Sequence, residues 1–210
     1  MGIYIEALLL YIVLFFSGTA VLPAASEGFS VVIELQRIFL YSIPSIALIW
    51  FMILRTKKIK DCNLIPCKND IISCLIAFPC LLITGFSVTF FSAFFGGKSV
   101  QILIQTPSAA FGWTVLGISC IFFAYLEESF FRFYFLARRD ELKLKAAAAI
   151  IISAALFSIC HIYEGPWGFI NSLLSAIILG IIYLRFKSLH GIAFAHGFYN
   201  ITAYILAAGA

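Results

Sequence analysis

Long apolar runs separated by short polar interruptions follow one another along the whole chain. A helix needs about 20 predominantly apolar residues to cross the hydrocarbon core of a membrane. The runs are continuous and do not show the ten-residue alternating pattern of barrel strands, which favours transmembrane helices. The pattern predicts seven spanning helices, near residues 3–22, 38–54, 71–95, 111–136, 146–163, 167–184 and 191–208.

The composition agrees with a membrane protein. Of the 210 residues, 63% are hydrophobic and 11% are charged, whereas soluble domains contain about 25% charged residues. No polar segment is long enough to form a separate soluble domain, so we expect an all-α, polytopic bundle with a single domain over residues 1–210. Glu6 stands where a signal peptide would carry basic residues, which favours a first spanning helix over a cleaved signal.

Positive charges are concentrated in alternate predicted loops. The loops after the second, fourth and sixth helices carry most of them, whereas the opposite loops contain Arg37 and Lys98. The positive-inside rule then predicts a multi-pass protein of the cell membrane, with a cytoplasmic N-terminus and an outer C-terminus. The net charge of +4 therefore reflects orientation in a lipid bilayer and gives no reason to infer nucleic-acid binding. The charged loop residues are Arg55, Lys57, Lys58, Lys60, Lys68, Arg138, Arg139, Lys143, Lys145, Arg185 and Lys187.

Few ionisable or amide side chains lie inside the predicted helices. A charge at the centre of a spanning helix costs about 2.5–3.5 kcal/mol on insertion scales, so such residues are candidates for function. They are Glu127, Glu128, Arg132, His161, Asn171, His196 and Asn200.

The three charges of the fourth predicted helix separate by helical geometry. Glu128 and Arg132 are four residues apart with the acid first, which favours an ion pair on one face. Glu127 is rotated by about 100° from Glu128 and has no local partner. A carboxylate without a partner in a low-dielectric site holds a proton more readily than one in water, which suits a general base. The alternative is that all three charges only join neighbouring helices.

Two further helices carry polar groups at helical spacing. His161 ends the fifth predicted helix, one turn after Phe157 on the same face. His196 and Asn200 are four residues apart and share a face of the last helix. The Asn amide and a His ring nitrogen could together hold the oxygen of a polarised carbonyl. Alternatively, these groups could make interhelical hydrogen bonds, each worth about 0.6–2 kcal/mol.

Three motifs follow one another in the second half of the chain. They are E-E-x-x-x-R as "EESFFR", F-x-x-x-H as "FSICH" and H-x-x-x-N as "HGFYN", between residues 127 and 200. Together they resemble the CPBP family of intramembrane proteases. That family includes the type II CAAX prenyl endopeptidases and the bacterial Abi and bacteriocin-processing proteins.

The resemblance implies an intramembrane endopeptidase that acts on a membrane-associated protein or peptide. In such proteins the first Glu of the pair activates a water molecule with help from the His of the second motif. The His and Asn of the third motif bind the oxyanion. Carried onto this chain, the catalytic residues are Glu127, His161, His196 and Asn200, with Glu128 and Arg132 in a supporting role.

Metal dependence and a non-enzymatic function are the open alternatives. Two His and two Glu could bind zinc, but the chain has no H-E-x-x-H arrangement, so we predict a metal-free site with zinc as the less favoured alternative. A bacteriocin immunity factor or a proton-coupled carrier could use the same polar cluster for binding or proton relay. No internal repeat is evident, which argues against a carrier built from repeated halves.

Overall fold

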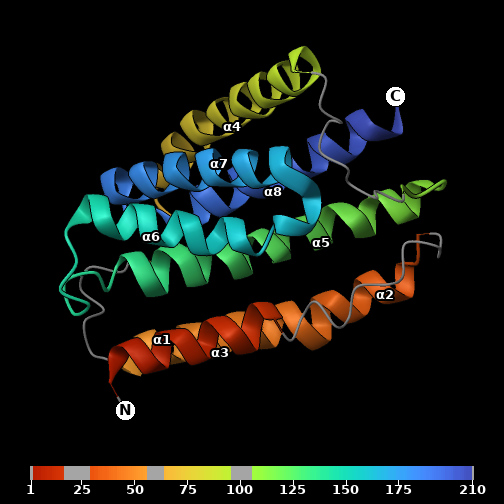
Figure 1. Ribbon diagram of the computed structural model, residues 1–210. Coiled ribbons are helices and arrows are strands. Elements are labelled where there is room, and N and C mark those ends of the chain that lie inside the picture. Colours follow the sequence, from red (N-terminus) through yellow and green to blue (C-terminus); the bar gives the residue numbers. More distant parts are fainter. Residues whose placement is uncertain (1, 17–28, 56–63, 96–105, 210) are drawn as a thin grey trace.

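The computed structural model describes residues 2–16, 29–55, 64–95 and 106–209 (Figure 1). The described part of the chain is helical and contains no β-strand, so the predicted all-α class is confirmed. Each of the seven predicted helical regions contains a helix, although the fifth ends at Ile159, before the predicted residue 163. The elements are α1 (Ile3–Tyr11) with the π-helix Ile12–Phe16, α2 (Val31–Gln36), the π-helix Arg37–Ser42, α3 (Ile43–Arg55), α4 (Lys68–Phe94), α5 (Ala110–Glu128) with the π-helix Ser129–Leu136, α6 (Ala146–Ile159), the 3-10 turn Ile162–Glu164, α7 (Gly165–Phe186) and α8 (Leu189–Ala208).

Several of these helices are suited to a bilayer. Within the described ranges, four helical stretches are long and apolar enough to span it, namely Val31–Arg55, Lys68–Phe94, Ala110–Leu136 and Ile162–Phe186. Ile3–Phe15 and Ala146–Ile159 are shorter apolar helices. Large apolar side chains such as Leu75 and Phe90 point outward with 69% and 66% of their surface exposed, as lipid-facing residues do. The protein is therefore a membrane protein of the helical-bundle type.

The second helix begins at Val31, earlier than the predicted start at residue 38. The Ser30 side chain caps this end by accepting a hydrogen bond from the Ile33 amide at 3.4 Å. Arg37 therefore lies inside the helical stretch, and its assignment to a loop was wrong. It remains inside because Glu34, one turn earlier, pairs with it at 2.9 Å.

The described positive charges of the loops lie at one end of the helical bundle. The N-terminus, the segment between α5 and α6, and the link between α7 and α8 lie at one end of the bundle, at the left of Figure 1. The described basic residues of the charged loops belong to this end. Its assignment to the cytoplasm stays a prediction. Residues 17–22, Lys57, Lys58, Lys60 and Lys98 lie outside the described residues.

The Glu6 carboxylate accepts hydrogen bonds from two side chains at this end of the bundle. The Arg138 guanidinium donates to Glu6 Oε1 at 2.8 Å, and the Tyr134 hydroxyl donates to the same oxygen at 2.5 Å. Tyr4 donates to the carbonyl of Leu142 at 2.7 Å. These contacts join α1 to the π-helix Ser129–Leu136 and to the segment after it, next to the EESFFR motif.

Helix α8 packs against both α4 and α5, and α7 packs against α6 and α4. Helix α8 lies close against α5 at Gly197. A Cβ there would lie 2.5 Å from Ile121 Cδ1 and 3.0 Å from Ile121 Cα. Because backbone cannot move aside as a side chain can, the glycine fixes the distance between these two helices beside His196.

Gly197→Ala is therefore expected to destabilise the protein by about 1–3 kcal/mol through overpacking. The matched control is Gly117→Ala on α5, where a Cβ would meet Ile201 Cδ1 at 3.8 Å, an ordinary contact. Thermal unfolding in lipid nanodiscs should show a lower Tm for Gly197→Ala and an unchanged or higher Tm for Gly117→Ala. Equal effects of the two substitutions would contradict this account of the interface.

Candidate active site

The acidic motif lies where α5 changes into a π-helix. Glu127 and Glu128 are the last two residues of α5, and the Ala137 amide donates to the carbonyl of Arg132, five residues back, at 2.9 Å. π-Helical turns are rare and frequently occur at functional sites. The three charged side chains are buried, with exposures of 4% for Glu127, 0% for Glu128 and 1% for Arg132.

Glu128 has two partners. Arg132 Nε lies 3.0 Å from Glu128 Oε2, so the same-face ion pair is present. Glu128 Oε1 lies 2.9 Å from His196 Nδ1 on α8. Arg132 is held further by Ala176, whose carbonyl accepts from Nη2 at 3.2 Å. Glu128 thus fixes the orientation of the His196 ring, because a carboxylate on one ring nitrogen determines where the other nitrogen points.

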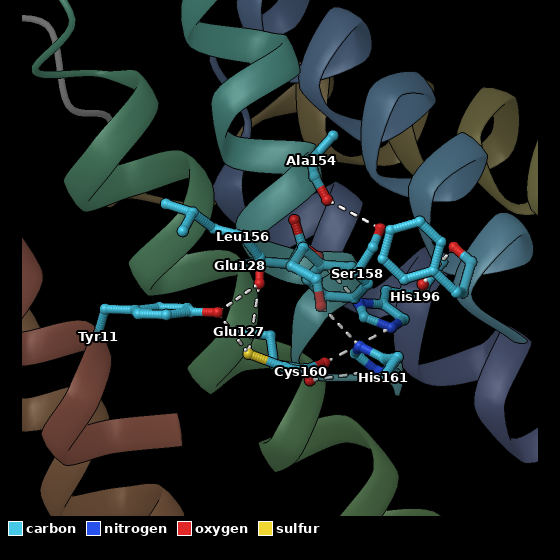
Figure 2. A network of polar contacts seen from close by, with 12 residues as sticks. Tyr11, Glu127, Glu128, Ala154, Leu156, Ser158, Cys160, His161 and His196 are labelled. Carbon is cyan, nitrogen blue, oxygen red and sulfur yellow. Dashed lines mark hydrogen bonds and ion pairs between the residues drawn. The ribbon is translucent and has the colours of Figure 1, made fainter. Parts of the chain in front are cut away.

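The Glu127 carboxylate faces both histidine rings (Figure 2). Its Oε1 is 3.8 Å from His161 Nε2, and its Oε2 is 3.7 Å from His196 Nε2. Both distances exceed a direct hydrogen bond. Since a water molecule can bridge polar groups at such separations, the carboxylate and the two rings form a polar pocket suited to holding one.

The tautomer of neutral His161 follows from its backbone contact. Its Nδ1 lies 2.9 Å from the carbonyl of Phe157, and a carbonyl can only accept, so Nδ1 carries the hydrogen. Nε2 of the neutral ring is then an acceptor directed at Glu127. The ring also stacks on Phe157 with centroids 4.4 Å apart, which holds its plane in position.

His161 lies beyond the end of α6, which stops at Ile159. The prediction of a helix to residue 163 was wrong, because the chain tightens here into a turn in which the His161 amide donates to the carbonyl of Ser158 at 3.0 Å. The neighbouring Cys160 points toward α1, where its thiol lies 3.3 Å from the Tyr11 hydroxyl (Figure 2). The turn places His161 opposite Glu127.

A cavity of about 630 Å³ opens beside these groups. Its wall includes all four residues that the sequence marked as catalytic, Glu127, His161, His196 and Asn200. Asn200 lies one turn after His196 on α8 and, within the described part of the chain, its amide has no hydrogen-bond partner. Glu128 and Arg132 lie behind the wall. Motifs separated by more than 60 residues in the sequence therefore converge on one cavity.

Other polar residues of the wall were not predicted from the sequence. Glu34 pairs with Arg37 and accepts a hydrogen bond from the Ser119 hydroxyl of α5. It was missed because the second helix was expected to begin after it, although an acid and a base three residues apart next to an apolar run could have indicated a helical pair. Glu164 was missed because it lies in the turn between two predicted helices.

Asn171 was a candidate from the sequence and has an interhelical partner. It donates to the hydroxyl of Tyr199 on α8 at 3.0 Å, and both residues lie on the cavity wall. A metal site is the alternative that the sequence left open. Among the residues that the structure describes, no group of three His, Cys, Asp or Glu side chains could hold a metal ion. A metal-free site nevertheless stays a prediction.

Fold and site together define a polytopic helical membrane protein with a Glu, two His and an Asn around an internal cavity. The family model described as type II CAAX prenyl endopeptidase, Rce1-like, matches residues 107–202, which include all three motifs. Over these residues the match confirms the resemblance to the CPBP/CAAX proteases that the motifs predicted. The match supports an intramembrane protease in general, acting on membrane-associated substrates. Searches of curated proteins and of solved structures found no match.

Proposed function

We propose that the protein is an intramembrane endopeptidase that hydrolyses a peptide bond with water activated by Glu127. The observation that carries this proposal is the Glu127 carboxylate, held 3.7–3.8 Å from two histidine Nε2 atoms on the wall of a cavity. Peptide hydrolysis needs a base for the water, donors for the oxyanion and a proton for the leaving amine. The residues around the cavity can supply all three.

In the first step Glu127 removes a proton from water while the water oxygen bonds to the substrate carbonyl carbon. His161 Nε2, an acceptor in the neutral ring, orients that water from the other side. The carbonyl oxygen becomes an oxyanion next to the Asn200 amide and His196 Nε2. In the second step the proton held by Glu127 passes to the amide nitrogen, the C–N bond breaks, and a carboxylic acid and an amine leave.

His196 can donate to the oxyanion only if Nε2 carries a hydrogen. Its Nδ1 faces the Glu128 carboxylate at 2.9 Å, so donation from both nitrogens requires the doubly protonated ring. The carboxylates of Glu127 and Glu128, one on each ring nitrogen, are the counter-charges for that form. Arg132 in turn holds Glu128. Through Glu128, the buried ion pair therefore supports the doubly protonated form of His196 next to the reacting groups.

Cleavage of defined peptides tests the proposal. The matched family is named for CAAX prenyl endopeptidases, so the first probes are peptides with a prenylated cysteine near the C-terminus, with unprenylated copies alongside. Purified protein in nanodiscs should generate new termini that mass spectrometry detects. If no membrane peptide is cleaved and Glu127→Gln instead changes pH-dependent uptake into vesicles, the protein is a carrier and the proposal fails.

Metal dependence has a separate test. Because the mechanism uses protein groups for every proton transfer, we expect the cleavage rate to survive exhaustive chelation followed by removal of the chelator. The rate is measured before chelation, after it, and after adding zinc back. Activity lost on chelation and restored by zinc would overturn the metal-free mechanism.

A further inference from the structure

Glu164 places a carboxylate on the cavity wall that the peptidase mechanism does not use. Its amide donates to the carbonyl of His161 at 3.0 Å, so Glu164 lies one tight turn from the His161 ring. Gly165 follows with φ +83°, a left-handed conformation that suits glycine. A Cβ on Gly168 would lie only 2.3 Å from Glu164 Cβ, so the Glu164 side chain lies directly over the first turn of α7.

The fold gives this carboxylate no cationic partner. Among the described residues, no Lys or Arg forms an ion pair with Glu164, and its side chain makes no hydrogen bond to the start of α7. The Tyr163 side chain, which is neutral, is its hydrogen-bonding neighbour. His196 lies within electrostatic range. However, the two ring nitrogens of His196 already face Glu127 and Glu128.

The described cation of the cavity wall outside the histidines is also paired. Arg37 donates to Glu34 at 2.9 Å and stacks over the ring of Phe123 at 4.9 Å. The second oxygen of Glu34 accepts a hydrogen bond from Ser119. Apart from the carboxylate that activates water, Glu164 is therefore the described wall acid that has no cation beside it. A carboxylate in such apolar surroundings gains strongly from a cation that reaches it.

We propose that Glu164 binds a basic side chain, Lys or Arg, of the peptide substrate close to the bond that is cleaved. This assignment rests on the peptidase function proposed above. A tight turn advances about 2 Å per residue, so the three residues from His161 to Glu164 span about 6 Å. An extended peptide advances about 3.3 Å per residue. The basic residue therefore lies within about three positions of the cleaved bond, and Glu164 determines specificity without taking part in the reaction.

Paired peptides test the assignment with protein in nanodiscs. One member of each pair carries Lys at a position near the cleaved bond, and the other carries norleucine, which is Lys without the ammonium group. At one position within about three residues of the bond, we expect kcat/KM to be about tenfold higher for Lys, as for a hydrogen bond between charged groups. No preference for Lys at any of these positions would overturn the proposal.

Glu164→Gln keeps the shape of the side chain and removes its charge. It should abolish the preference for Lys and cleave the norleucine peptide within about twofold of the wild-type rate. An equal loss on both peptides would overturn the proposal, since Glu164 would then serve the reaction or the fold. A preference that survives the substitution would overturn it as well.

Two further variants separate a local contact from the overall charge of the protein. Glu164→Arg should prefer a peptide with Glu at the same position, and a continued preference for Lys would overturn the proposal. Asp140→Asn is the matched control, because it neutralises a carboxylate that is 84% exposed in the segment between α5 and α6. It should keep the full preference for Lys. Loss of the preference in Asp140→Asn would show that overall charge attracts basic peptides, which would also overturn the proposal.

Binding separates this inference from the proposed function. Glu127→Gln protein should bind a fluorescent prenylated peptide with Lys about tenfold more tightly than its norleucine copy. Adding Glu164→Gln should remove the difference. If the difference is present and wild-type protein cleaves no peptide, the proposed function fails and the cation site stands. If peptides are cleaved with no preference for Lys, the inference fails and the peptidase function stands.

Discussion

Glu127→Gln is expected to abolish peptide cleavage while leaving the fold intact. The amide has nearly the same shape as the carboxylate but cannot accept the proton of the attacking water. Loss of a general base typically lowers a rate by about 10²–10⁴-fold. The rate should be measured per mole of folded protein in nanodiscs, with the folded fraction taken from size-exclusion chromatography and circular dichroism. The substitution also removes a buried charge that has no Lys or Arg partner among the described residues, so unfolding is not expected.

Asp140→Asn provides the control for Glu127→Gln. It makes the same carboxylate-to-amide change in the segment between α5 and α6, on a side chain that is 84% exposed and far from the cavity wall. Its cleavage rate should equal that of the wild type. An unchanged rate in Glu127→Gln would remove this residue from the mechanism. If Glu127→Gln does not fold, Glu127→Asp is the second variant. It keeps a carboxylate on a shorter side chain, so it should fold and cleave slowly.

Arg132→Met is expected to cost about 3–5 kcal/mol of stability, the usual penalty for leaving one member of a buried ion pair alone. Glu128 is fully buried and would keep a charge without its guanidinium partner at 3.0 Å. Expression and the Tm in nanodiscs should both fall. A Tm within about 2 °C of wild type would contradict this view of the pair.

The double variant Glu128→Gln/Arg132→Met separates stability from catalysis. Removing both charges avoids the isolated buried charge, so the double variant should unfold at a higher temperature than Arg132→Met alone. Its cleavage rate should remain low, because His196 Nδ1 loses the carboxylate that orients the ring. A double variant no more stable than the single one would show that the two side chains do not act as a pair.

The membrane bundle could be predicted because apolar runs of spanning length indicate helices on their own. The start of the second helix could not be predicted. Glu34 and Arg37 resemble polar loop residues in the sequence, whereas in the structure they pair with each other and Glu34 accepts a hydrogen bond from Ser119 of α5. Here Arg37 is satisfied by Glu34 of the same helical stretch, and Glu34 also by Ser119 of another helix. A partner 85 residues away leaves no mark in the local pattern.

For the site, helical spacing separated Glu127 from the pair Glu128 and Arg132. It could not show that Glu128 also holds His196, 68 residues further along, because that contact depends on how closely α8 approaches α5. It also missed the π-helix after Glu128 and the turn that carries His161. The sequence therefore indicated which residues to consider, and the packing shows which of them meet.

Single-turnover cleavage in water labelled with heavy oxygen tests the central claim most directly. If Glu127 acts as a base, the new carboxyl terminus of the substrate carries the heavy oxygen and the Glu127 side chain stays unlabelled. If Glu127 attacks the substrate as a nucleophile and water opens the resulting anhydride at the Glu127 carbon, the first product receives an ordinary oxygen from the protein and the label appears in Glu127. Mass spectrometry of both product and protein distinguishes these results, and label in Glu127 would contradict the mechanism proposed for this site.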